Sequence, residues 1–186
     1  MRVISGNFKG RQLKAVPNRL TRPTTDKVKE ALFQIIGPFF QGGSCLDLFA
    51  GSGGLGIEAL SRGMEKAVFV DKQPKAVRTI YDNLRTLKLE EAAEVFRTDA
   101  FMALKAAGKR ELLFDVIFLD PPYSKVSYEE LLEAIDTYNL LTKEGLIVCE
   151  HERRDTLKDE CGSFSRRQTE IYGGTTGITI YHRKEQ

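Results

Sequence analysis

The sequence predicts an α/β fold with a central, mostly parallel seven-stranded sheet, an antiparallel last strand and helices on both faces. Two observations lead to this prediction. From Ser44 onward, short apolar runs alternate with segments of helical periodicity, which is typical of a parallel sheet. Near the C-terminus, two further apolar runs flank a glycine-rich turn and predict an antiparallel hairpin. We expect two regions, a basic N-terminal extension over residues 1–40 and a main domain over residues 41–186.

The N-terminal extension is predicted to contain a short hairpin, a connector and one helix. Residues 2–16 alternate loosely and turn between residues 7 and 10, which indicates the hairpin. The connector contains Pro23, and the residue before a proline avoids helical geometry. Thr25 or Asp26 can then cap a helix that ends at Gly37. The apolar face of this helix is formed by residues at helical spacing, namely Val28, Ala31, Leu32 and Ile35.

The main domain is predicted to alternate strands and helices in a regular order. Ser127 stands three residues before Glu130, a capping box that marks the beginning of the last helix. The C-terminal hairpin is expected over residues 164–172 and 178–182, on either side of its glycine-rich turn. The other strands are expected over residues 44–49, 66–70, 94–98, 114–119 and 145–150, and the helices over 55–63, 74–87, 100–107 and 127–139.

A glycine-rich turn follows the first strand of the main domain. Asp47 closes the apolar run, and Gly51, Gly53 and Gly56 then lead into a helix. Glycines let the backbone bend sharply and come close to a ligand, where a Cβ atom would clash. A strand, a glycine turn and a helix N-terminus together form a site for a nucleotide-like ligand. This pattern suits NAD, FAD and S-adenosylmethionine, and a glycine turn without a ligand also fits it.

Acidic residues follow the next three strands as well. Asp71 closes the second run about twenty residues on, where an acid can hold both hydroxyls of a ribose. Asp99 follows the third run, and Asp120 follows the fourth and opens the motif Asp-Pro-Pro-Tyr. Ligands of open α/β sheets bind at the carboxyl edge of the strands, so we expect one site there. Asp-Pro-Pro-Tyr has no role in hydride transfer, which argues against a dehydrogenase. Any one of these acids could also be an ordinary surface residue.

Composition places the chain among soluble, single-domain proteins. It has 186 residues, of which 41% are hydrophobic and 29% charged. No apolar run approaches the ~18 residues of a membrane span, and the first residues lack the pattern of a signal peptide, so we expect a cytoplasmic protein. The three cysteines are widely spaced, which indicates neither disulfides nor zinc. With only two histidines, we expect no metal site.

The charge is distributed unevenly. Residues 1–30 carry eight basic against two acidic side chains, a net charge of +6, and the other 156 residues carry −4 because the total is +2. A basic segment on a mildly acidic body favours contact with nucleic-acid phosphates. Phe8, Asn7 and Gln12 lie among the basic residues and could contact bases. A solvated basic face without a partner is the other interpretation.

These motifs resemble the Rossmann-like S-adenosylmethionine methyltransferases that modify exocyclic amino groups. The resemblance rests on the segment from Asp47 to Gly56, on Asp71, on Asp99 and on Asp120-Pro-Pro-Tyr123. Further motifs resemble the bacterial family that methylates N2 of one guanine in small-subunit (16S) ribosomal RNA, and together they extend the resemblance to nearly all of the chain. They are Arg2-Val-Ile-Ser-Gly6, Gly10-Arg11, Arg22-Pro-Thr24 and Val28-Lys-Glu-Ala-Leu-Phe33.

The resemblance implies the cofactor S-adenosylmethionine and assigns site residues. Asp120 and Pro121 would accept hydrogen bonds from the guanine amine, Pro122 would stiffen the loop, and Tyr123 would stack on the extruded base, worth ~1–3 kcal/mol. The cofactor would be held by Asp47, Phe49, Gly51, Gly53, Gly56, Asp71, Lys72, Asp99 and Ala100. The RNA would be contacted by Arg2, Arg11, Arg22, Thr24 and Lys29.

The resemblance leaves the acceptor open between two amines. Asp-Pro-Pro-Tyr suits adenine N6 in DNA or RNA as well as guanine N2, although DNA enzymes of that type usually carry a large target-recognition domain. A Rossmann-like module that binds RNA or a nucleotide without chemistry is a second alternative. Carbon-5 methylation of pyrimidines would need a cysteine nucleophile, which usually follows a proline, and no cysteine here does. We expect 16S ribosomal RNA as partner, free or in an assembled small subunit, and a monomer without membrane or metal partners.

Overall fold

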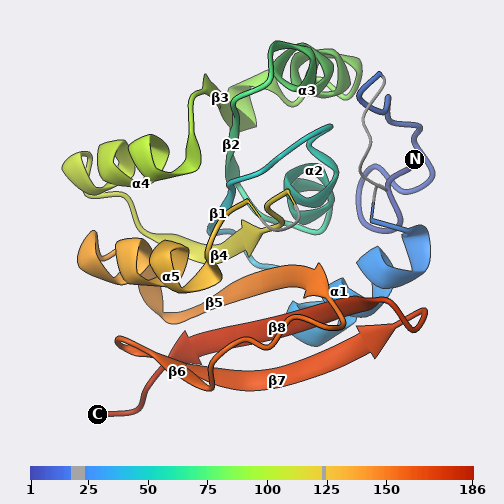
Figure 1. Cartoon of the computed structure of the whole chain (residues 1–186). Coiled ribbons are helices and arrows are strands. Elements are labelled where there is room, and N and C mark those ends of the chain that lie inside the picture. Colours follow the sequence, from blue (N-terminus) through green and yellow to red (C-terminus); the bar gives the residue numbers. More distant parts are fainter. Residues whose placement is uncertain (18–23, 123–124) are drawn as a thin grey trace. The chain divides into compact units, whose positions relative to one another are not determined.

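The computed structural model describes residues 1–17, 24–122 and 125–186. The chain divides into two compact units, Met1–Ala100 and Phe101–Gln186 (Figure 1). Residues 1–17 and 24–40 belong to the first unit, together with the beginning of the main domain. The predicted division at residue 40, between an RNA-recognition extension and a methyltransferase domain, therefore stays a prediction.

The predicted N-terminal hairpin is present, held by few hydrogen bonds. Arg2 and Gln12 form an antiparallel bridge. The Val3 amide donates to the Arg11 carbonyl at 2.9 Å, and the Gly10 amide donates to the Val3 carbonyl at 2.8 Å. The two sides of the hairpin share only a short stretch of pairing, so they do not form regular strands. Both sides also bond to the rest of the first unit. We call residues 1–14 the N-terminal hairpin.

Helix α1 (Asp26–Ile36) begins where the sequence predicts. Thr25 is its N-cap, and the Thr25 hydroxyl accepts a hydrogen bond from the Val28 amide at 3.3 Å. Leu32 and Phe33 are completely buried on its apolar face, and the helix ends at Gly37. The predicted cap and end are confirmed. Of the predicted apolar face, Val28 and Leu32 are buried, but Ala31 and Ile35 are only partly buried, and Phe33 is buried although it was not predicted there.

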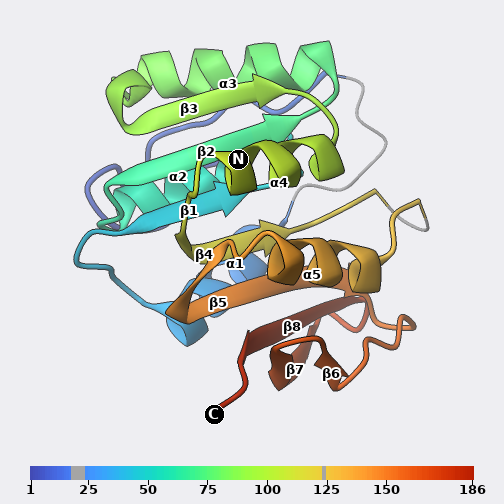
Figure 2. The same ribbon diagram turned by 90° about the vertical axis from the view of Figure 1, so that its left-hand side faces the viewer.

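The first unit contains three parallel strands, β1 (Ser44–Asp47), β2 (Lys66–Asp71) and β3 (Ala93–Arg97). β2 lies between the other two, with Asp47 opposite Phe69 and Asp71 opposite Arg97. Helices α2 (Gly54–Ser61) and α3 (Pro74–Thr86) lie on one face of these strands, and a short 3₁₀ turn, η1 (Glu90–Ala92), precedes β3 (Figure 1). Because the strands run in the same direction (Figure 2), their carboxyl ends share one edge.

The second unit combines one parallel and three antiparallel strand pairings. Helix α4 (Ala100–Lys109) begins at the boundary between the units. β4 (Phe114–Leu119) pairs in parallel with β5 (Leu141–Glu152), and α5 (Tyr128–Thr137) connects them. β8 (Thr176–Arg183) then pairs antiparallel with both β5 and β7 (Phe164–Tyr172), which confirms the predicted hairpin and the antiparallel last strand.

The described residues form eight strands, one more than predicted. The additional strand, β6 (Glu160–Cys161), pairs with the first residues of β7 and is only two residues long. A strand this short has no detectable periodicity, so the sequence could not show it. β5 is also longer than the predicted run, because it begins at Leu141 and includes the exposed Lys143 and Glu144.

Apolar residues of β1, β2, β4, β5 and β8 are buried in the core, whereas β3 has no fully buried residue. Phe69 of β2, Phe118 of β4 and Ile147 of β5 are completely buried, as is Ile180 of β8. Among the described residues, no helix has the length and apolar character that crossing a membrane requires.

Candidate functional site

The turn after β1 has the backbone shape that its glycines predict. Gly51 and Gly53 have positive φ angles of 57° and 85°, values that residues with a Cβ rarely adopt. The Gly53 amide donates to the Ala50 carbonyl at 2.8 Å, which closes the turn directly before α2. We call residues 50–54 the glycine turn. Its backbone lies at the carboxyl edge of the first unit's strands, where nucleotide-like ligands bind in open α/β sheets.

Asp47 has a structural partner inside the unit. Its side chain is 2% exposed, and its Oδ2 atom accepts a hydrogen bond from the Gly56 amide at 3.0 Å. A Cβ atom on Gly56 would lie 2.3 Å from the Phe69 ring. Asp47 therefore holds the first turn of α2 against the strands, and Gly56 allows α2 to approach β2. Phe49, between them in sequence, is partly buried.

Asp71 holds the other side of the glycine turn. One carboxylate oxygen accepts from the Gly51 amide at 2.9 Å, and the other accepts from the Gln73 amide at 2.9 Å. Asp71 is 9% exposed, whereas the adjacent Lys72 is exposed. A carboxylate offers about four acceptor positions, so these two bonds leave capacity for a ligand hydroxyl. The position suits the ribose contact that the sequence predicts.

Asp99 and Ala100 lie where β3 leads into α4. Asp99 is exposed, and Ala100, the first residue of α4, is buried. The next residues, Phe101 and Met102, are 38% and 64% exposed, which is unusual for large apolar side chains. Asp99 is thus accessible to solvent, as the adenine contact that the sequence predicts requires.

Asp120 directly follows β4 in the second unit. It is partly buried, Pro121 is buried and Pro122 is partly buried. Tyr123, the last residue of the motif, lies outside the described residues. Prolines fix φ and carry no N–H, so they stiffen this segment without donating to nearby acceptors.

Tyr128, the first residue of α5, is bonded to the end of β5. Its hydroxyl donates to the Glu150 carbonyl, and its ring meets the His151 ring edge-on with centroids 6.2 Å apart. Burial raises the pKa of the Tyr128 phenol, and the negative charge of Asp120 contributes to the rise. The hydroxyl therefore stays protonated and remains a donor at neutral pH.

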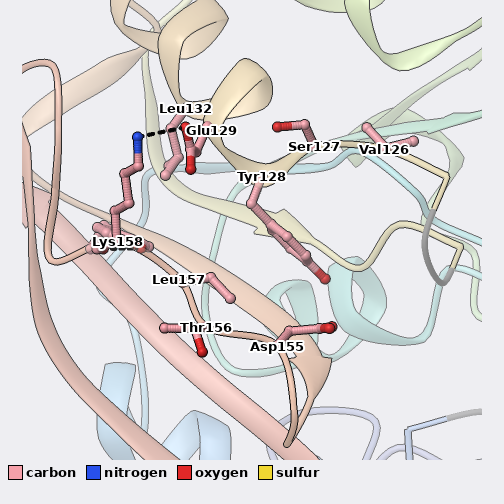
Figure 3. Close-up of a pocket in the computed structure, with 10 residues that line it drawn as sticks. Val126, Ser127, Tyr128, Glu129, Leu132, Asp155, Thr156, Leu157 and Lys158 are labelled. Atoms are coloured by element: carbon pink, nitrogen blue, oxygen red, sulfur yellow. Dashed lines mark hydrogen bonds and ion pairs between the residues drawn. The ribbon is translucent and has the colours of Figure 1, made fainter.

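A pocket of about 250 Å³ opens beside this tyrosine. Figure 3 shows the start of α5 on one side, with Tyr128 pointing away from the helix, and residues 155–158 on the other. Lys158 forms an ion pair with Glu129 at 2.9 Å at its rim. The pocket offers apolar walls, hydroxyls and charges of both signs, a mixture suited to a polar organic group. The sequence analysis did not identify it, because its two sides are far apart in the chain.

The predicted RNA-contacting residues differ in exposure. Arg2 is exposed and paired with Asp26 at 2.9 Å, and the exposed Arg11 donates to the Thr86 carbonyl at 3.3 Å. Thr24 is partly buried, whereas Arg22 lies outside the described residues.

Lys29, the remaining member of that set, is 2% exposed and is directed into the unit. Its Nζ atom donates to the Arg2 carbonyl at 2.6 Å and lies 3.7 Å from Glu58 Oε2. Burial lowers the pKa of Lys29, while the neighbouring Glu58 opposes that shift. The structure thus gives Lys29 a role in attaching α1 to the hairpin, and does not place it among the exposed basic residues.

Two buried polar residues that the sequence analysis did not identify attach the hairpin to the helices. Glu58 of α2 accepts from the Ile4 amide at 2.9 Å and the Ser5 amide at 3.1 Å. Asn83 of α3 bonds to both Lys14 and Ser52. A signal existed for Asn83, because it falls on the apolar face of α3, where a polar residue needs a partner.

No group of three or more potential metal ligands occurs among the described residues.

Comparison with known proteins gives consistent matches along the chain. A model of the family described as "Conserved hypothetical protein 95" matches residues 1–182. The Bacillus subtilis protein "Putative rRNA methyltransferase YlbH" is 55% identical over 184 residues, 99% of this chain and 100% of that protein. The Haemophilus influenzae protein "Ribosomal RNA small subunit methyltransferase D" is 37% identical over 182 residues, 97% of this chain and 91% of that protein.

Solved structures confirm the predicted fold class. The Escherichia coli protein yhhF, described as a putative methyltransferase, has a TM-score of 0.86 and 32% identity, covering 100% of this chain and 99% of that one. The fold is therefore the mostly parallel, Rossmann-like α/β fold of the methyltransferases. Since the family model spans nearly all residues and relatives match over their whole length, the chain belongs to the family of bacterial small-subunit ribosomal RNA methyltransferases that its motifs predicted.

Proposed function

We propose that this protein transfers a methyl group from S-adenosylmethionine to the exocyclic N2 amine of a guanine in 16S ribosomal RNA. Membership of the family supports the coarser statement, cofactor-dependent methylation of ribosomal RNA. The observation that carries the choice of an amine is the Asp120-Pro121-Pro122 segment at the carboxyl end of β4, since its acceptors suit N–H groups.

The first unit has residues that fit the cofactor. Gly51 and Gly53 adopt positive φ angles and carry no Cβ atom that would block a ligand, and Asp71 retains acceptor capacity for ribose hydroxyls. Asp99 and the Ala100 amide would meet the adenine. When bound, S-adenosylmethionine supplies a methyl group on a positively charged sulfur.

Asp120 would prepare the acceptor. The guanine amine is planar and a poor nucleophile, because its lone pair is delocalised into the ring. Hydrogen bonds from its N–H groups to the Asp120 carboxylate and the Pro121 carbonyl would favour a pyramidal nitrogen aimed at the methyl group. Catalysis is then chiefly alignment and exclusion of water. The nitrogen–carbon bond would form as the sulfur–carbon bond breaks, S-adenosylhomocysteine would be the leaving group, and the methylated nitrogen, which is acidic, would then release its proton. Asp120 therefore need not be a strong base.

The N-terminal hairpin would contact RNA phosphates. Lys9, Arg11 and Lys14 are exposed on it, whereas Lys29 is buried and is left out of this proposal. Each basic side chain that neutralises a phosphate releases counterions, so affinity falls with salt in proportion to the number of phosphates neutralised. Reversing Lys9, Arg11 and Lys14 to Glu should weaken the dependence of affinity on salt. The magnitude of the slope of log affinity against log salt should fall by about 1 for each phosphate that is no longer neutralised.

The matched control reverses Lys105, Lys109 and Lys143, which are equally exposed and lie outside the hairpin. If the slope falls equally in the two triple variants, overall charge explains the effect, and the hairpin is not the RNA-binding surface.

One experiment tests the acceptor. The protein is incubated with S-adenosylmethionine carrying a labelled methyl group and with unmodified 16S ribosomal RNA, either free or in small subunits, and the labelled nucleoside is identified after digestion. We expect N2-methylguanosine. Label in N6-methyladenosine would identify adenine N6, and not guanine N2, as the acceptor. No label in either substrate, from a protein that binds the cofactor, would favour a non-catalytic module.

A further inference from the structure

Asn83 lies at the junction of three segments of the first unit. It belongs to α3 and is only 2% exposed. Its side-chain amide donates to the Ser52 carbonyl at 2.9 Å and to the Lys14 carbonyl at 3.0 Å. Its carbonyl oxygen accepts from the Lys14 amide at 2.8 Å. One side chain thus binds both backbone groups of a hairpin residue and a backbone carbonyl of the glycine turn.

The glycine turn meets the hairpin at a second point. The Ser52 hydroxyl lies 3.4 Å from the sulfur of Met1, and a Cβ atom on Gly54 would lie 3.1 Å from that sulfur. Met1 is itself paired with the other side of the hairpin, since its carbonyl accepts from the Leu13 amide at 2.8 Å. Met1, Leu13 and Lys14 therefore form the end of the hairpin that contacts the glycine turn.

The hairpin is also fixed to α2, the helix that follows the glycine turn. Ser61 accepts from the Asn7 amide through its carbonyl at 2.8 Å, and its hydroxyl donates to the Ser5 carbonyl at 2.7 Å. A Cβ atom on Gly6 would lie 1.9 Å from the Ser61 carbonyl oxygen, so the two backbones are in direct contact. With Glu58 bonded to the Ile4 amide, the hairpin cannot shift without straining α2 or the turn.

We propose that Asn83 is a positioning residue that couples RNA binding by the N-terminal hairpin to cofactor binding by the glycine turn. The inference rests on the proposed function, which assigns these two ligands. Asn83 touches neither. It acts through two hydrogen-bonded residues. One is Ser52, which lies between Gly51 and Gly53 in the sequence, and the other is Lys14, an exposed basic residue of the hairpin.

The physical basis is shared ordering of one hydrogen-bonded unit. A ligand that fixes the hairpin restricts Lys14 and, through the Asn83 amide, the Ser52 carbonyl. The second ligand then meets a turn that is already ordered, and its affinity rises because less conformational freedom is lost. Such coupling is reciprocal, so each ligand should strengthen the other by the same factor.

The test compares dissociation constants with and without the other ligand. S-adenosylhomocysteine replaces the cofactor so that no turnover occurs, and its affinity is measured by calorimetry with and without saturating unmodified 16S ribosomal RNA. We expect RNA to tighten binding by at least about fivefold in the unaltered protein. In the Asn83→Leu variant, which keeps the volume and removes all three hydrogen bonds, this ratio should fall clearly toward one, although the contacts of Met1, Ser61 and Glu58 remain.

Thr79→Val is the matched control. Thr79 is buried on α3 one turn before Asn83, but its hydroxyl bonds only to the Lys75 carbonyl of the same helix. This variant should retain the ratio of the unaltered protein even if its melting temperature falls. If Asn83→Leu does not fold, Asn83→Asp is used, because it keeps the acceptor for the Lys14 amide and removes both donors.

The outcomes separate this inference from the proposed function. If the unaltered protein binds both ligands with a ratio of one, or if the Asn83 variants keep the full ratio, the coupling role is wrong and the function stands. If the unaltered protein binds neither S-adenosylhomocysteine nor RNA, the proposed function fails with it.

Discussion

The acids at the strand ends form two contrasting pairs. Asp47, the last residue of β1, and Asp71, the last residue of β2, are 2% and 9% exposed, and both accept hydrogen bonds from amides of the glycine turn, α2 or the start of α3. Asp99 after β3 is exposed, and Asp120 after β4 is only partly buried. The same residue type at or just beyond the ends of four strands therefore has different surroundings. The first pair supports the backbone around the glycine turn, and the second pair keeps more contact with solvent, where we predict that its carboxylates meet ligands.

Burial explains the difference. A carboxylate removed from water needs charge-assisted hydrogen bonds, and the backbone amides near Asp47 and Asp71 supply them. The N-terminus of α2 favours a negative charge nearby, which adds to the stabilisation of Asp47. Asp99 precedes the buried Ala100 and stays in contact with solvent, so its carboxylate loses less hydration than those of Asp47 and Asp71. The two pairs should therefore respond differently to substitution.

The largest effect should come from Asp120→Ala. Removing the carboxylate that accepts from the acceptor amine should lower kcat by about 10²–10³-fold, the range found when one transition-state hydrogen bond is removed. The dissociation constant for S-adenosylmethionine, measured by calorimetry, should stay nearly unchanged. Asp115→Ala, on the same strand, is the control for loss of an acid, because Asp115 pairs with Thr142 at 3.2 Å, away from the strand end.

An equal fall in cofactor affinity would contradict this assignment. Asp120 would then bind the cofactor and not the acceptor amine.

An intermediate effect is expected for Asp71→Asn. The substitution keeps the shape and removes the charge that holds the Gly51 and Gln73 amides. Hydrogen bonds to charged groups contribute about 1.5–3 kcal/mol, so cofactor affinity should fall by roughly 10–150-fold. The melting temperature should fall as well, because Asp71 also supports the turn. Glu65→Gln, at the opposite end of β2, is the control and should change neither quantity.

If Asp71→Asn lowers the melting temperature and leaves the cofactor dissociation constant unchanged, its role is structural only. That result would sharpen the comparison, since both buried acids would then serve the backbone alone.

The smallest effect is expected for Asp99→Ala. Solvent screens the charge of an exposed carboxylate, so its hydrogen bond to the cofactor should contribute only about 0.5–1.5 kcal/mol, and cofactor affinity should fall by roughly 2–10-fold. The melting temperature should fall only slightly, because Asp99 is exposed and directly precedes α4, where an acid can cap the helix. A marked loss of stability would show that Asp99 supports the fold in the way that Asp47 does, and would remove the distinction between the pairs.

Local patterns predicted most elements because their causes are local. Thr25 and Ser127 each place a hydroxyl within reach of an amide three residues later, and both cap their helices as predicted. The apolar runs of β2 and β4 are buried on both sides and therefore appear as continuous hydrophobic stretches. β6 was not predicted, since two residues carry no period.

The candidate site was predicted less completely than the fold. The glycine turn follows from backbone sterics, which the sequence displays directly, and the positive φ angles of Gly51 and Gly53 agree with it. The surroundings of Lys29 could not be inferred, because they depend on Glu58 of a helix almost thirty residues away. A basic residue in a basic segment is expected at the surface, yet this one is buried against an acid and a carbonyl.

The sequence by itself determined the strand and helix order, the glycine turn, the acids at the strand ends and the family, because each depends on residues that are neighbours or follow a fixed period. Only the tertiary structure decided which polar residues are buried and what they join. Glu58 and Asn83 bond to backbone groups 31 to 69 residues away along the chain. Such partners are backbone amides and carbonyls, which every residue carries, so no residue type in the sequence marks them.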